Sequence, residues 1–194
     1  MAPSASLQSN CDAVNDVSIR PFQLTDTEAL YEAVVESADA LKPWMPWCRS
    51  EYSTFEATEW IETQIDSFQQ GNQYQFAIVS NGQILGVCGL NGIQPENRLA
   101  NLGYWVRTSA CGRGIATAAA RLLVRWAFAN TDLDRLEFVV AVGNLASLRV
   151  AAKVGAVWEG MLRGRLRLND KTHDAILFSI MRSDAWGNGG HSPL

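Results

Sequence analysis

The sequence has no run of about 18 consecutive apolar residues, the length with which a helix begins to span a bilayer. Residues 1–16 also lack the basic and apolar regions of a secretory signal. We therefore expect no membrane span and no export, and so a cytoplasmic protein. Positive charge is not in excess either: the formal net charge is −4, which argues against a general nucleic-acid binder.

Histidine and closely spaced cysteine are also scarce. The chain has only two histidines, and none of its four cysteines forms a Cys-x-x-Cys pair. Zinc sites in proteins are usually built from such ligands at short spacing. We therefore predict no metal site, and four reduced thiols rather than disulfides.

What the chain does have is a globular composition, with 47% hydrophobic and 19% charged residues. This balance excludes disorder as its main state. Polar residues 1–16 and glycine-containing residues 185–194 are expected to be tails. The stretch between them has no linker or repeat, so residues 17–184 are predicted to form one domain.

Periodicity predicts an α+β fold in the order β-α-α-β-β-β-α-β-α-β-β. Strands are expected over 17–24, 74–79, 83–90, 99–107, 135–142, 157–168 and 173–181. Helices are expected to begin at the capping boxes Thr25–Glu28 and Ser53–Glu56, after Gly114, and over 145–154. Because a helix connects the fourth and fifth strands, those two are expected to be parallel.

Short turn and stop signals divide these elements. Asn81-Gly82 and Asn169-Asp170 predict two tight hairpins. Gly71 and Gly155 are expected to end two of the helices in the left-handed conformation that glycine tolerates.

A glycine loop, Cys-Gly-Arg-Gly-Ile-Ala-Thr at 111–117, joins a predicted strand to a predicted helix. Successive amides and a helix N-terminus make an anion site, and pyrophosphate is a natural ligand. The loop lacks the lysine of a Walker motif. A dinucleotide-binding loop is an alternative, but Asp132 and Asp134 precede the next strand rather than follow it. A tight turn with no ligand is the second alternative.

The loop is one of three motifs in a familiar order. Gly-Tyr-Trp at 103–105 precedes it, and Asn-x-x-Ser-x-x-Val-x-x-Lys-x-Gly at 144–155 follows it. Over residues 17–182 the chain resembles the GNAT N-acetyltransferase superfamily, and most closely its RimJ/RimL-type branch. The resemblance implies a mixed, mostly antiparallel sheet with two splayed parallel strands, flanked by helices.

The same resemblance implies an enzyme that moves an acetyl group from acetyl-CoA to a primary amine, with no metal. A protein or peptide N-terminal amine is the expected acceptor. A small amine, such as a polyamine, an amino acid or an antibiotic, is the alternative. An acyl-CoA-binding sensor without chemistry and a nicotinamide-dependent oxidoreductase are alternatives of other classes. RimJ/RimL-type proteins are often dimers, so a homodimer is a further expectation.

By resemblance, acetyl-CoA would lie between the strands at 99–107 and 135–142. The backbone of Trp105, Val106 and Arg107 would pair with the pantetheine arm, and the Val106 amide would polarise the thioester carbonyl. Asn144 would bind pantetheine, although an asparagine there also suits a helix N-cap. Lys153 would approach the phosphates or lie in solvent. The pyrophosphate would be held by Cys111, Gly112, Arg113, Gly114, Ile115, Ala116 and Thr117.

Two residues are implied to be catalytic. Ser147 would protonate the departing thiolate, and Tyr104 would orient the amine; an ordinary helix serine and a core tyrosine are the alternatives. Asn101 and Leu166 stand where relatives often carry acids, so a base is not carried over from them. Cys111 replaces a glutamine or arginine at the start of the loop. The base is left open between a side chain and water.

The resemblance implies that a proline-containing loop lines the acceptor slot. Its Trp44 and Trp47 would wall the acceptor slot or cap the core. Glu137 would act through water or be a surface charge. His173 would border the groove or form a structural pair with Asp174.

Three arginines, Arg163, Arg165 and Arg167, alternate along the strand predicted over 157–168 and would share one face. Such a face would attract an acidic acceptor, although a solvated strand face is the commoner explanation.

Overall fold

The computed structural model describes residues 16–49 and 51–186. One seven-stranded sheet runs through them in the order β1-β2-β3-β4-β5-β7-β6. The tails expected over 1–16 and 185–194 lie almost wholly outside the described residues. The strands are β1 (Ser18–Pro21), β2 (Tyr74–Ser80), β3 (Gln83–Gln94), β4 (Leu99–Val106), β5 (Arg135–Ala141), β6 (Val157–Leu168) and β7 (Lys171–Met181).

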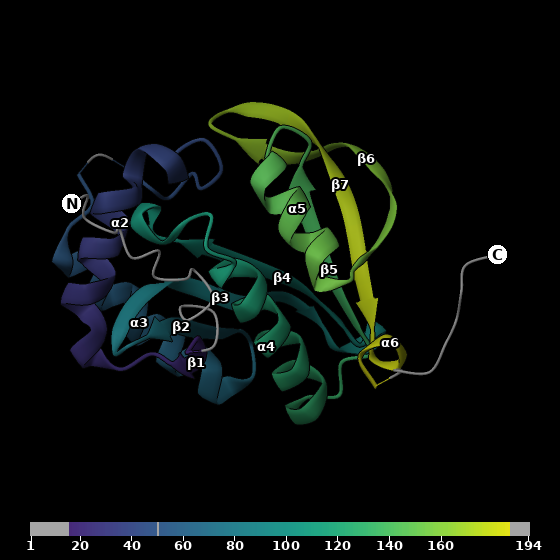
Figure 1. The fold of residues 1–194 in the computed structure, drawn as a ribbon, viewed down its shortest axis with the longest axis horizontal. Helices are drawn as coiled ribbons and strands as arrows, with labels where there is room; N and C mark the ends of the chain where they lie inside the picture. Colours follow the sequence, from purple (N-terminus) through teal and green to yellow (C-terminus); the bar gives the residue numbers. More distant parts are fainter. Residues whose placement is uncertain (1–15, 50, 187–194) are drawn as a thin grey trace, which may run out of the picture.

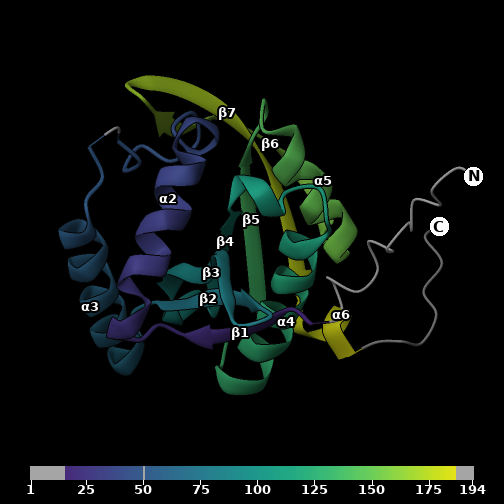
Figure 2. The same ribbon diagram turned by 60° about the vertical axis from the view of Figure 1, so that its left-hand side comes forward.

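Helices cover both faces of the sheet, as Figure 2 shows. On one face α2 (Thr27–Leu41) and α3 (Thr54–Gln70) bury apolar stripes that include Leu30 and Ile61. On the other face α4 (Ile115–Asn130) and α5 (Leu145–Val154) pack against a second core that contains Leu123 and Phe138. The short α6 (Arg182–Trp186), which the sequence analysis does not predict, follows β7.

The sheet is antiparallel except where β4 meets β5. These two strands pair in parallel only over Leu99–Asn101 and Arg135–Glu137. Beyond that point β4 stays with β3, and β5 stays with β7, so the sheet opens into a V (Figure 1). The expected mixed sheet with splayed parallel strands is therefore confirmed.

Most of the predicted turns and caps are present. Asn81 and Gly82 have φ of 49° and 73°, and Asn169 and Asp170 have 48° and 61°, as tight hairpin turns require. Ser53 caps α3: its hydroxyl accepts from the Glu56 amide at 3.3 Å, and its own amide donates to the Glu56 carboxylate at 3.0 Å. Gly71 and Gly155 end α3 and α5 with φ of 73° and 98°.

The predicted Thr25–Glu28 capping box is wrong. The chain instead makes a 3₁₀ turn at Leu24–Asp26 before α2 begins at Thr27. The Asp26 carboxylate is buried, accepts from the Gln23 amide at 2.9 Å and pairs with the Arg20 guanidinium at 2.7 and 2.8 Å. A buried carboxylate needs such partners, and this requirement sets where the helix starts.

The long β6–β7 hairpin reaches over the end of α2 (Figure 1). In its turn, the side-chain amide of Asn169 donates to the Lys42 carbonyl at 3.0 Å. The strand is interrupted by a bulge, because Leu162 pairs with Ala175 while Leu166 pairs with His173. The strand on which the arginines were predicted to alternate is therefore interrupted: Arg163 and Arg165 fall in the bulge, and Arg167 lies beyond it.

In the part of the chain that the structure describes, Cys48, Cys88 and Cys111 are unpaired thiols; Cys11 lies outside it. Over residues 16–49 and 51–186, no three acidic, cysteine or histidine side chains are grouped so as to hold a metal ion. Within the same ranges, every helix is too short or too polar to cross a membrane.

Candidate active site

Asn101 lies at the apex of the V, where β4 and β5 part. Its side-chain oxygen accepts from the Val139 amide at 3.4 Å, and its NH₂ group donates to the side-chain oxygen of Asn91 at 3.0 Å. Asn101 therefore satisfies a β5 amide that has lost its strand partner. A carboxylate could accept from Val139 but could not donate to Asn91.

Tyr104 of β4 and Ser147 of α5 meet across the gap. The tyrosine hydroxyl lies 3.0 Å from the Ser147 carbonyl oxygen, to which it donates, and 3.0 Å from Ser147 Oγ. The Ser147 amide donates to the side-chain oxygen of Asn144 at 3.1 Å, so Asn144 is the N-cap of α5. The structure thus brings together three of the predicted site residues, from two elements far apart in the sequence.

Burial raises the pKa of Tyr104 to about 12, against a smaller lowering by its hydrogen bond with Ser147. The phenol therefore stays protonated at neutral pH. It can hold the serine hydroxyl in place, but it is not a base.

The end of β4 turns the Val106 amide towards the gap. The Arg107 amide donates to the Leu85 carbonyl at 2.8 Å, which directs it towards β3. Successive amides of a strand point to opposite edges, so the Val106 amide faces β5. Trp105 directs its backbone towards β3, as Arg107 does, and its side chain is buried against α2 and α3.

The Arg107 side chain is held by α2 rather than by the gap. Its guanidinium pairs with the Glu36 carboxylate, with Nε at 2.8 Å. The other Glu36 oxygen accepts from the Ser109 amide at 2.8 Å, and the Ser37 hydroxyl accepts from the Thr108 amide at 3.0 Å. Helix α2 thus fixes the segment that leads into the glycine loop.

The glycine loop opens α4 with its amides uncapped. Gly112 and Gly114 have φ of 76° and 79°, and no side chain caps the helix N-terminus at Gly114. The first amides of an α-helix have no partner within the helix, and the helix dipole adds positive potential there. The loop therefore has the features of an anion site.

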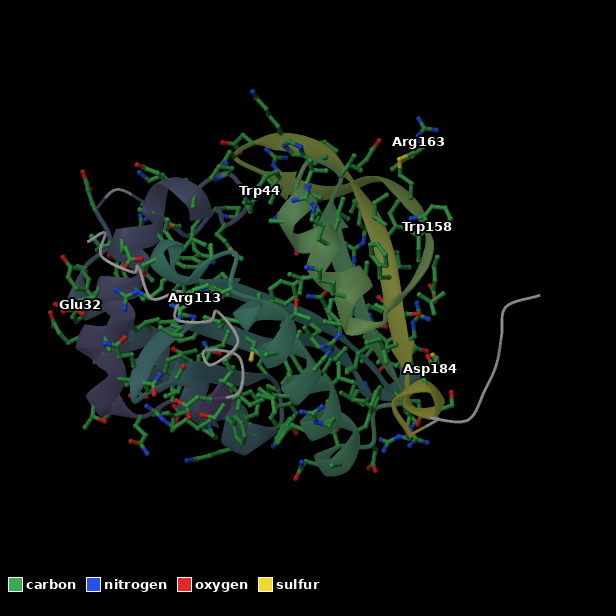
Figure 3. The ribbon with its side chains drawn as sticks, viewed as in Figure 1. Glu32, Trp44, Arg113, Trp158, Arg163 and Asp184 are labelled. Carbon is green, nitrogen blue, oxygen red and sulfur yellow. The ribbon has the colours of Figure 1, made fainter. Side chains whose placement is uncertain are left out.

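Side chains of the loop point in different directions. Ile115 and Thr117 are buried, so they offer amides rather than side chains. Ala116 is half-buried, while Arg113 is exposed at the N-terminal end of α4 (Figure 3). The Cys111 thiol donates to the Arg107 carbonyl at 3.5 Å, and burial of the thiol raises its pKa. It is therefore a neutral thiol that ties the loop to β4.

A pocket of about 590 Å³ lies on the other side of β4, under α2 and α3. Four aromatic side chains from α3, from the α2–α3 loop and from β4 line it: Trp47, Tyr52, Trp60 and Trp105. Tyr104, which contacts Ser147 in the gap, also lines the pocket. The pocket therefore meets the gap at β4.

One glycine, Gly103, lies on the floor of this pocket. Gln75, Gly89 and Gly103 lie side by side on β2, β3 and β4. A β-carbon at Gly103 would meet only the Asn91 side chain, at 3.7 Å, whereas one at Gly89 would lie 2.1 Å from the Gln75 carboxamide oxygen. The missing side chain at Gly103 therefore hollows the sheet, while the Gln75 side chain fills the space over Gly89.

The described lining holds one carboxylate, and it is paired. Glu56 binds Arg49 at 2.6 Å, and its pKa is lowered by hydrogen bonds from Ser53 and then from Arg49. Four carboxamides also line the pocket, from Gln64, Gln73, Gln75 and Asn91.

Three residues predicted for the acceptor side fall outside this pocket. Trp44 instead lies against Gly143, where a β-carbon would be 3.4 Å from its ring (Figure 3). Glu137 pairs with Arg135 at 2.8 Å, in register with Asn101, before the gap opens. The third is His173, on β7. On the cofactor side, Lys153 is exposed in the last turn of α5.

Of the two loop tryptophans, Trp47 does line the pocket, its ring centroid 6.4 Å from that of Trp105. The sequence analysis missed the carboxamides. A signal existed for Gln64, because a polar residue stands on the apolar stripe of Ile61 and Ile65. No comparable signal identifies Asn91.

Comparison with known proteins identifies the family of this chain. The acetyltransferase (GNAT) domain family matches residues 16–157. YdaF of Bacillus subtilis (strain 168) is 29% identical over 178 residues, 90% of this chain and 96% of YdaF. The ribosomal-protein-serine acetyltransferase of Escherichia coli (strain K12) is 27% identical over 150 residues, 77% of this chain and 84% of that protein.

Solved structures show the same fold. RimL, a ribosomal α-N-protein acetyltransferase solved in complex with coenzyme A, superposes with a TM-score of 0.81 at 25% identity, covering 88% of this chain and 96% of RimL. The family match spans most of the chain, and both the fold and the three motifs agree with it. The chain therefore belongs to the GNAT acetyltransferase family, with relatives of the RimJ/RimL type.

Proposed function

We propose that this protein transfers the acetyl group of acetyl-CoA to the α-amine at the N-terminus of a peptide or protein. One observation carries the proposal: Tyr104 lines the aromatic pocket and also contacts Ser147 across the β4–β5 gap. An amine in the pocket and a thioester in the gap would therefore meet at β4. Direct transfer needs this arrangement, because the two reacting groups must be brought into contact.

The donor side fits a phosphate-bearing, extended thioester. The uncapped amides after Gly112 would bind the pyrophosphate, as helix N-termini do. The free side-chain NH₂ of Asn144 and the open β4 edge would hold the pantetheine arm. The Val106 amide would donate to the thioester carbonyl oxygen; one such donor is typically worth about 10²–10³ in rate.

Proton movements then follow from the residues present. The neutral amine forms the new N–C bond as the C–S bond breaks, and Ser147 donates its hydroxyl proton to the departing sulfur. Tyr104, held protonated by its raised pKa, positions Ser147. Among the described lining residues, the one carboxylate is already paired with Arg49. The amine therefore loses its proton to water, which then reprotonates the serine.

The acceptor side favours a peptide over a polyamine. A polyamine carries several positive charges, and each would need a carboxylate or would lose hydration in an aromatic pocket. The described lining is close to neutral and rich in carboxamides. Relatives named for ribosomal-protein acetylation support the same acceptor class.

The test is release of the CoA thiol by purified protein with peptides that begin with Ser, Ala or Met, with spermidine, and with an aminoglycoside. The exposed Cys111 requires a control without acceptor. We expect release only with peptides. Release only with spermidine or the aminoglycoside would reject the peptide acceptor. Heat stabilisation by acetyl-CoA without release from any acceptor would favour a sensor.

A further inference from the structure

The side chain of Gln64 is buried without a partner. It is 7% exposed on the inner face of α3, and its Oε1 has no hydrogen-bond partner among the described residues. Buried polar groups in proteins are nearly always paired, and an unpaired one destabilises the fold. A leucine would suit the apolar stripe of Ile61 and Ile65 better. The glutamine therefore needs a reason that the fold alone does not supply.

The position of Gln64 in the fold supplies a reason for a glutamine there. Gln64 and Gln75 line both the aromatic pocket and a smaller hollow beside it, so they form the wall between the two. Gln75 is on β2, two strands from β4 in the row Gln75–Gly89–Gly103. Strands lie about 4.8 Å apart, so this wall is about 10 Å from the transfer point at β4.

An extended peptide spans that distance in its first residues. It rises about 3.3 Å per residue, so with its α-amine at β4 the polar groups of its second and third residues reach the wall. A peptide unit offers an N–H donor and a carbonyl acceptor, and a carboxamide offers the same pair. Gly103 leaves room at β4 for a peptide backbone to pass.

We propose that Gln64, together with Gln75, is the subsite that binds the backbone of the second and third residues of the acceptor peptide. The proposal rests on the peptide acceptor proposed above and adds to it a length requirement. A free amino acid or a one-residue amide cannot reach the wall, so it leaves Gln64 Oε1 without a hydrogen-bond partner. The enzyme should therefore prefer peptides of three residues or more.

The experiment compares kcat/KM for a length series that begins with serine: serine amide, and then a dipeptide, tripeptide and tetrapeptide amide. In the wild type, kcat/KM should rise with length up to the tripeptide. In Gln64→Leu it should fall about five- to tenfold for the tripeptide, the worth of one neutral hydrogen bond, and stay unchanged for serine amide. Gln69→Leu makes the same change at an exposed position of α3 that lines the smaller hollow but not the aromatic pocket, and it should leave the series unaltered.

A second readout does not depend on activity. Because Gln64→Leu removes an unpaired buried oxygen, its melting temperature without ligand should be higher than that of the wild type by a few degrees. A variant that is more stable yet discriminates less by length is the signature of a binding group. A lower melting temperature would show that Gln64 is paired within the fold and would overturn the proposal.

The outcomes separate this inference from the proposed function. If no peptide of any length is acetylated, the peptide acceptor itself fails. If peptides are acetylated but Gln64→Leu lowers kcat/KM equally for serine amide and the tripeptide, the acceptor stands and the subsite is wrong. A wild type that acetylates serine amide as well as the tripeptide also rejects the subsite.

Discussion

Asn101 illustrates how one side chain shapes the gap. Its side-chain carboxamide accepts a hydrogen bond from the Val139 amide and donates one to Asn91. These two hydrogen bonds close the end of the V, where strand pairing stops. The family resemblance implied an acid at this position, and the sequence analysis took its replacement as the loss of a candidate base. The structure shows what the amide does instead, which the sequence alone does not reveal.

Ser147 is the residue on which the proton transfer to sulfur depends. We expect Ser147→Ala to lower kcat about 10²-fold, the usual contribution of a positioned acid, with little change in acetyl-CoA affinity. Thiol-release assays measure kcat, and calorimetry measures the affinity for acetyl-CoA. Thr63→Ala, which removes an exposed hydroxyl of α3, is the control. An unchanged kcat in Ser147→Ala would assign the proton to water.

The absence of an unpaired acid or histidine in the described lining predicts a simple pH profile. The rate should follow the fraction of neutral amine, which rises tenfold per pH unit below the α-amine pKa of about 8 and then levels off. Tyr104, with a pKa of about 12, adds no inflection in this range. Measuring kcat/KM between pH 5.5 and about 9 tests this. A second inflection near pH 6 would indicate an enzyme base.

At the scale of elements, the sequence predicts what local chemistry decides. Asn81-Gly82 and Asn169-Asp170 adopt positive φ because tight hairpins need it, and Gly71 and Gly155 end their helices for the same reason. Ser53 and Glu56 cap α3 as expected. All of these signals depend on a few neighbouring residues.

Features that depend on distant residues are not predictable in this way. The ion pair between Asp26 and Arg20 moves the start of α2 past the predicted box. The bulge in β6 depends on Asp174 of the next strand, whose carboxylate accepts from the Gly164 amide at 2.7 Å. The aromatic pocket depends on three strands in register, so its floor glycine, Gly103, could not be recognised beforehand.

Glu36 connects α2 to the glycine loop, and we expect it to make stability depend on pH. Hydrogen bonds from Arg107 and from the Ser109 amide lower its pKa from 4.5 to about 2. A carboxylate with a lowered folded-state pKa stabilises the fold above about pH 4.5 and loses this contribution as the pH falls towards 2. Glu36→Gln should lower the melting temperature at pH 7 by about 2–4 °C and weaken its decline below pH 4.5.

The control for this prediction is Glu32→Gln, which changes an exposed carboxylate on the outer side of the same helix (Figure 3). Thermal unfolding across pH 2.5–7 should separate the two variants. Equal melting curves would show that the ion pair with Arg107 does not hold the loop.

Gly103 tests whether the pocket floor receives the acceptor. A β-carbon there meets no backbone, so Gly103→Leu should fold and fill the hollow. We expect the acceptor KM to rise at least about tenfold, because the larger side chain occupies the substrate volume. The affinity for acetyl-CoA, measured by calorimetry, should stay within about twofold. An unchanged acceptor KM would place the amine elsewhere.

Across the whole molecule, the two faces of the sheet differ in what they present. The face with α4 and α5 presents the glycine loop and Ser147, and the face with α2 and α3 encloses the pocket (Figure 2). Strand β4 connects the two, because Tyr104 lines the pocket and also contacts Ser147. The homodimer expected from the resemblance stays a prediction, which sedimentation can test.

The central claim is that the acetyl group goes to an α-amine. The most direct measurement incubates a tripeptide that begins with serine and contains an internal lysine with the protein and acetyl-CoA. Fragmentation mass spectrometry then locates the added group. The account predicts one acetyl group on the N-terminal nitrogen and none on lysine. Acetylation of the lysine alone, or of spermidine but not the peptide in a parallel reaction, would contradict it.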